Sequence, residues 1–151
     1  MAAEYLANAQ QSVNNLSPVI FTASIPCTKG YVYHEDETGI FILRGIVNCP
    51  CAQFATYRVA FNANIAIPTG GDVVAIATAI SVNGEERPTS RAVVTPAAVQ
   101  EFNNVTSTCI IKVPRGCCFN LSIDAVPANT IEAPAQTILV ENANLVIDRI
   151  A

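Results

Sequence analysis

Four cysteines in two closely spaced pairs are the residues of this chain whose type and spacing could do chemistry. Cys49 and Cys51 flank Pro50, whereas Cys117 and Cys118 are adjacent in the sequence. Thiolates can bind a soft metal ion, form a disulfide or act as nucleophiles, and buried thiols can pack as inert apolar side chains. Deciding between these roles requires knowing which elements carry the two pairs.

The spacing of the four cysteines argues against one kind of metal site but does not select a single role for them. A Cys-Pro-Cys triplet is not the C-x₂-C knuckle of structural zinc sites. Because proline cannot donate to a strand ladder, we expect a loop at residues 48–54, and the Pro-Arg-Gly at 114–116 predicts a turn. If both connections lie at one end of a barrel, a cysteine of the first pair could meet one of the second. Three interpretations of these cysteines therefore stay open: inert thiols, a disulfide and a metal cluster. Cys27 and Cys109 stand alone and are expected to pack as small apolar residues.

The single histidine, His34, lies beside three acidic residues in HEDET. One interpretation is a general base or metal ligand, and the other is a solvated hairpin loop between Tyr33 and Gly39. We favour the loop, because no local signature pairs this histidine with a nucleophile. The sequence contains no P-loop, dinucleotide fingerprint or EF-hand pattern, so we predict no catalytic residue and no cofactor.

Hydrophobic residues recur with a period near two along most of the chain, which is typical of β-strands. Proline- and glycine-bearing turns separate the apolar runs, and residues 95–102 could form one helical turn. The pattern predicts an all-β, antiparallel β-sandwich, a jelly roll of about eight to ten strands. Strands are expected at residues 19–25, 39–47, 56–67, 73–82, 90–95, 105–113, 118–126 and 137–150.

The 151 residues fit one domain with a sizeable core. We assign residues 1–18 to an N-terminal arm, either frayed or a docking segment, because they are rich in Ala, Asn and Gln. Residues 19–151 are expected to form the single jelly-roll domain.

Composition excludes several classes of partner. The chain is 51% hydrophobic and 13% charged, unlike a disordered protein, and no apolar run is long enough for a membrane span. The net charge of −4 and the scattered arginines argue against nucleic-acid binding. The N-terminus resembles no secretory signal, so we expect synthesis in the cytoplasm without a signal peptide.

The run at residues 73–82 is apolar on both faces of the expected strand. A sandwich strand with one solvated face should alternate. This pattern indicates an outer face covered by another subunit, and hence a homo-oligomer with closed cyclic symmetry.

Segments spread over nearly the whole chain carry a family resemblance. They are YLANAQQSVNNLSPVIFT, CTKGYVYHEDETGIFILRG, AFNANIAIPTGG, TPAAVQEFNNVTSTCIIKVPRGCCFNLSI and NANLVIDRIA. The sequence resembles small proteins of gut Firmicutes and their phages, most of them uncharacterised. Its strand order and the VP-x-G element between two apolar strands are similar to tumour-necrosis-factor-like and complement-like jelly rolls, which form compact trimers.

This resemblance implies a non-enzymatic structural protein of a phage virion, a homotrimer that decorates or cements the capsid or forms part of a head fibre. Its partners would be capsid or other structural proteins, with a host-surface glycan as a further candidate. The alternative is a carbohydrate- or protein-binding module on a bacterial or spore surface. A cupin-like metalloenzyme is disfavoured, because such sites use several histidines and this chain has one.

Overall fold

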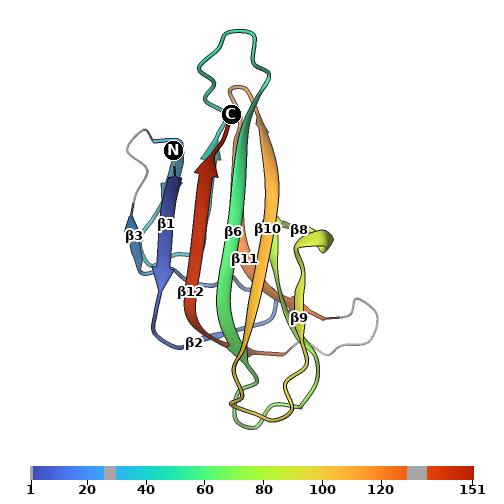
Figure 1. Ribbon diagram of the computed structural model, residues 1–151. Coiled ribbons are helices and arrows are strands. Elements are labelled where there is room, and N and C mark those ends of the chain that lie inside the picture. The colour runs from blue at the N-terminus through green and yellow to red at the C-terminus, as the bar shows by residue number, and fades with distance from the viewer. Residues whose placement is uncertain (1, 26–29, 129–135) are drawn as a thin grey trace.

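The computed structural model describes residues 2–25, 30–128 and 136–151, which form two antiparallel β-sheets packed face to face (Figure 1). The predicted all-β sandwich with jelly-roll character is therefore confirmed. The described residues contain twelve strands, more than expected, because several edge strands are only two or three residues long. No helix among the described residues has the length and apolarity needed to cross a membrane.

The first sheet, sheet A, has the order β10–β6–β12–β1–β3, and β2 pairs with the start of β12. In β6, buried and more exposed residues alternate along the strand, because one face meets the core and the other meets solvent. The strands of this sheet are β1 (Ala2–Ala7), β2 (Gln11–Val13), β3 (Ala23–Ile25), β6 (Phe54–Ala66), β10 (Asn103–Pro114) and β12 (Ile138–Arg149).

The second sheet, sheet B, has the order β4–β5–β11–β7–β8, and β9 also pairs with β7. Asn83 and Gly84 both have positive φ and link β7 to β8 as a two-residue hairpin, which is the turn that an Asn-Gly pair favours. The strands of this sheet are β4 (Val32–His34), β5 (Phe41–Arg44), β7 (Ile76–Val82), β8 (Glu85–Glu86), β9 (Ala92–Val94) and β11 (Cys118–Pro127).

A short 3₁₀ helix, η1 (Pro88–Ser90), interrupts the edge of sheet B between β8 and β9. The side chain of its last residue, Ser90, replaces a backbone partner that β7 lacks where η1 interrupts the edge strand. The buried Ser90 hydroxyl accepts a hydrogen bond from the Ile80 N–H (2.9 Å) and donates one to the Arg87 carbonyl (2.7 Å). The helical turn expected at residues 95–102 is absent, and a non-helical turn lies there instead.

The core fills the space between the sheets with aromatic and branched side chains that are fully buried. Phe21 and Phe41 meet edge to face with ring centroids 5.5 Å apart, and Tyr5 meets Phe41 at 4.5 Å. The largest fully buried side chains are Tyr57, Phe21, Phe41, Phe61, Leu43, Ile65, Ile67, Ile80, Ile111, Leu121, Ile123 and Leu145.

The N-terminal segment is part of the sandwich, and the predicted division of the chain into an arm (1–18) and a domain (19–151) is corrected here. Strand β1 lies inside sheet A, paired with β12 on one side and β3 on the other. Its inward residues Ala3, Tyr5 and Ala7 are buried. The arm was predicted from a composition rich in Ala, Asn and Gln, and alanines at two of the three inward positions give little hydrophobic contrast that would reveal a strand.

Strand β7 is buried on both faces within the single chain, so its apolar pattern does not require a sister subunit. One face contributes Ile76 and Ile80 to the core. On the other face, Ala77 and Ala79 pack with Val126 in a small separate cluster. The outer residues are small enough for neighbouring segments of the same chain to cover them, so this strand does not indicate an oligomer.

Candidate functional site

The two cysteine-bearing connections lie at the same end of the sandwich, as predicted, beside the C-terminus (Figure 1). The Gly45 N–H donates to the Cys117 carbonyl (2.8 Å), and the Gly116 N–H donates to the Gly45 carbonyl (3.0 Å). The Arg115 N–H donates to the Gln53 carbonyl (2.9 Å). We call this end, formed by residues 45–53 and 114–118, the cysteine end.

Gly45 allows the two backbones to approach this closely. A Cβ atom at this position would lie 2.0 Å from the Pro114 carbonyl oxygen and 3.0 Å from that of Cys117. A side chain of any size would therefore push the two connections apart. The requirement here is close approach of backbones rather than an unusual φ angle.

The sulfur contact at this end lies inside the triplet. The Cys49 and Cys51 Sγ atoms are 2.6 Å apart, and both residues are exposed. The hydrogen bond with the Cys51 side chain, reinforced by backbone N–H groups, lowers the pKa of the Cys49 thiol below its usual value. This thiol is therefore set up to ionise more readily than an ordinary surface cysteine.

The second pair is exposed at the start of β11, where Cys118 lies opposite Arg44 in the sheet. All five cysteines in the described ranges are free thiols, and Cys27 lies outside those ranges. Cys109 is partly buried against the core, as expected for a small apolar residue, and burial raises the pKa of its thiol. Within the described residues, no three potential metal-ligating side chains gather.

His34 lies at the end of β4 rather than in a solvated loop. Its ring stacks on Phe41 with centroids 4.3 Å apart and meets Tyr5 edge to face at 5.0 Å. Its Nε2 atom lies 2.8 Å from the Thr38 carbonyl, and because a carbonyl only accepts, Nε2 carries the proton. The three acidic residues that follow are exposed. His34 itself packs against aromatic side chains at the edge of the core.

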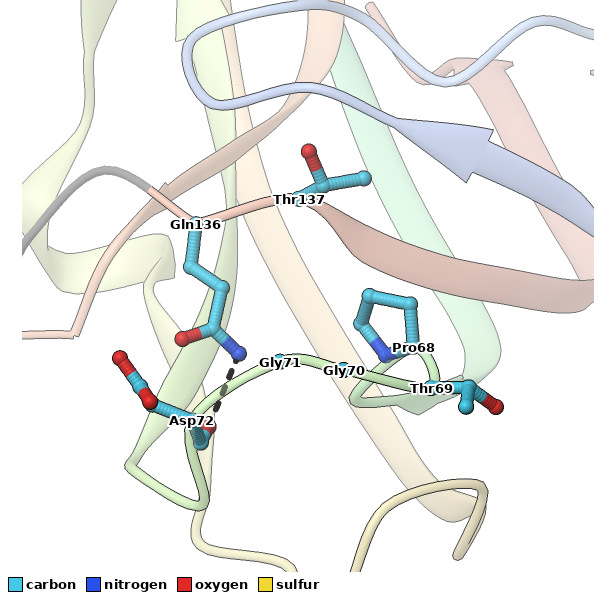
Figure 2. Close-up of a pocket in the computed structure, with 7 residues that line it drawn as sticks. All are labelled: Pro68, Thr69, Gly70, Gly71, Asp72, Gln136 and Thr137. Carbon is cyan, nitrogen blue, oxygen red and sulfur yellow. Dashed lines mark hydrogen bonds between the residues drawn. The ribbon is translucent and has the colours of Figure 1, made fainter.

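A shallow polar depression of about 330 Å³ lies at the opposite end of the molecule, against the loop that follows β6 (Figure 2). The Gln136 side chain crosses it and donates a hydrogen bond to the Asp72 carbonyl (3.0 Å). The side chains of Thr69 and Asp72 point away from each other. The depression is lined by Pro68, Thr69, Gly70, Gly71, Asp72, Gln136 and Thr137.

Each long edge of the sandwich carries two of the exposed large apolar side chains. At the edge formed by β3 and β4, Ile25 and Tyr33 are 59% and 50% exposed. At the opposite edge, Val93 on β9 and Ile110 on β10 are 51% and 47% exposed. These edges lie at opposite sides of the molecule, because β3 and β10 end sheet A while β4 and the β8–β9 edge end sheet B (Figure 1).

Comparison with solved structures shows the fold. The globular domain of zebrafish complement 1qA superposes with a TM-score of 0.62 at 13% identity, covering 99% of this chain and 97% of that chain. Eiger TNF from S. frugiperda gives 0.64 at 10% identity (100% and 92% covered), and murine APRIL gives 0.61 at 10% (99% and 98% covered). No protein-family model and no curated protein matches the chain.

These identities support likeness of fold only. The predicted resemblance to tumour-necrosis-factor-like and complement-like jelly rolls is confirmed at that level, over essentially the full length of both chains. A relation to proteins of gut Firmicutes and their phages stays a prediction.

Proposed function

We propose that this chain is a non-enzymatic structural module that acts as a homotrimer through protein–protein contacts. The observation that carries the proposal is the pair of different apolar edges. A closed ring of identical subunits uses head-to-tail contacts, in which one surface of each subunit meets a different surface of its neighbour. Exposed apolar residues on two opposite edges supply two such surfaces.

The full-length match to complement- and TNF-type jelly rolls supports the trimeric state in particular. Domains of this fold typically work as compact trimers whose strength comes from buried area and multivalency. For the biological setting we propose a phage virion, with the trimer decorating the capsid or forming part of a head fibre. Quantifying the protein in purified phage particles and in whole bacterial cells tests this setting, and enrichment on cells without particles contradicts it.

Charged substitutions at the two edges test the assembly. We expect Ile25→Glu and Ile110→Glu each to give monomers in size-exclusion chromatography with light scattering, because each variant disrupts every contact of the ring. Val73→Glu is the matched control, since Val73 is 50% exposed in the loop between β6 and β7, belongs to none of the edge strands and should leave the trimer intact.

Mixing the two edge variants sharpens this test. A mixture keeps one undamaged interface, formed by the intact edge of each variant, so at most a heterodimer should form. Trimers from either variant alone would refute assembly through these edges.

The alternative function, carbohydrate or protein binding on a bacterial or spore surface, is favoured by the polar depression in Figure 2. Its hydroxyl, amide and carboxylate groups are of the kind that sugars bind. However, its side chains diverge and one of them already binds the chain's own backbone. A glycan array that gives a hit abolished by Asp72→Ala and Thr69→Ala together would favour this alternative over assembly.

A further inference from the structure

The Cys-Pro-Cys triplet is held in a defined loop conformation. Pro50 fixes one backbone dihedral between the two cysteines, and its carbonyl accepts a hydrogen bond from the Arg115 guanidinium. The Ala52 N–H donates to the Cys49 carbonyl (3.1 Å) and closes a turn around the triplet. These contacts bring the Cys49 and Cys51 Sγ atoms to 2.6 Å while both residues stay exposed.

We propose that Cys49 and Cys51 form a reversible disulfide within this loop, installed by a low-molecular-weight disulfide such as oxidised glutathione. A covalent S–S bond is about 2.05 Å long, so a small movement of the two sulfurs closes it. The sequence alone directed attention to a bond between the two cysteine pairs. The structure points instead to a bond inside the first pair.

The exchange proceeds in two balanced steps. The Cys49 thiolate attacks one sulfur of oxidised glutathione, which releases one glutathione thiolate and leaves a mixed disulfide on Cys49. The Cys51 thiolate then attacks the Cys49 sulfur and releases the second glutathione thiolate. The two cysteines lose two electrons and two protons in total, and the glutathione disulfide gains them as two thiols.

The position of the triplet suits a reversible bond better than a structural one. A disulfide gains stability mainly by closing a long loop in the unfolded chain, and this one would enclose a single residue. Its exposure leaves it open to attack by other thiols, which is the property of labile disulfides. We therefore expect oxidation to change the chemistry of the cysteine end while leaving the fold intact.

A tryptic map of the intact chain tests the proposal, because cleavage after arginine separates the two pairs. Cys49 and Cys51 fall in the peptide 45–58, and Cys117 and Cys118 fall in the peptide 116–149. The reduced protein is incubated with oxidised glutathione, its remaining thiols are blocked with N-ethylmaleimide, and the non-reduced digest is analysed by mass spectrometry. We expect peptide 45–58 to be unblocked, unlinked and lighter by two hydrogens, and to take up two blocking groups after reduction.

Each other outcome overturns the proposal. Peptides 45–58 and 116–149 joined by a disulfide would show a bond between the pairs, and a blocked peptide 45–58 would show no bond at all.

The double variant Cys117→Ser/Cys118→Ser should oxidise like the natural chain, whereas Cys51→Ser should stop at a glutathione adduct on Cys49. Oxidation should also be several-fold faster in the folded chain than in urea, because the loop holds the sulfurs together, and equal rates would contradict this role of the fold.

Discussion

At the residue scale, the Cys49 thiol is the most distinctive chemical feature of the chain. Its pKa is lowered chiefly by the hydrogen bond with the Cys51 side chain, whereas burial raises the pKa of Cys109. A lower pKa gives a larger thiolate fraction at any pH below it, and the thiolate is the reacting form. We therefore expect iodoacetamide to alkylate Cys49 faster than Cys109 near neutral pH.

The pH dependence of Cys49 alkylation shows whether the contact with Cys51 lowers the pKa of Cys49. Replacing Cys51 by alanine removes the hydrogen-bond partner, so the pKa of Cys49 should rise and the midpoint of its rate profile should move to higher pH. Cys51→Ser keeps a donor and should shift the midpoint less. Identical midpoints in the natural chain and Cys51→Ala would show that the contact has no effect on the thiol.

At the scale of elements, the interrupted edge of sheet B depends on one hydroxyl. The Ser90 side chain takes the place of a backbone carbonyl for the Ile80 N–H where η1 breaks the edge strand. Ser90→Ala leaves this buried donor unpaired, which should lower the free energy of unfolding by about 1–3 kcal/mol. Urea denaturation measures the loss, with the exposed Ser12→Ala as control, and a loss no larger than that of the control would contradict the assignment.

The N-terminal strand should be essential to the fold. Deleting residues 1–7 removes β1 from between β12 and β3, exposes two sheet edges and leaves the core uncovered. We expect this variant to lose its cooperative thermal transition. The milder Tyr5→Ala should lower stability by about 3–5 kcal/mol, as for other large buried side chains. A deletion variant that melts at the same temperature as the full chain would restore the interpretation of this segment as an arm.

The long strands β6, β7, β10, β11 and β12 could be predicted from the sequence, whereas β1, β2, β4 and β8 could not. Alternation in residues 105–113 and 118–126 located β10 and β11 to within a few residues, because each has one face in the core. Strands of two or three residues such as β8 are too short to show a period. In β1, alanines at two of three inward positions hid the alternation, and in β7 small outer residues made a self-covered strand look like an interface.

At the scale of the whole molecule, the sequence located the cysteine end but not its contacts. Pro50 and the Pro-Arg-Gly turn indicated two connections that could meet, and they do. The sulfur contact within one loop depends on side-chain directions in irregular backbone, which no periodic pattern encodes. The apolar edges were also hidden, because Ile110 and Ile111 are alike in the sequence and only the register of β10 makes the first exposed and the second buried.

Native mass spectrometry of the full chain at micromolar concentration tests the central claim, assembly through the two apolar edges, most directly. The account predicts a dominant species of three times the 16.0 kDa chain mass, which the edge variant Ile110→Glu converts to a single chain. A natural chain that remains at 16.0 kDa under these conditions would contradict it.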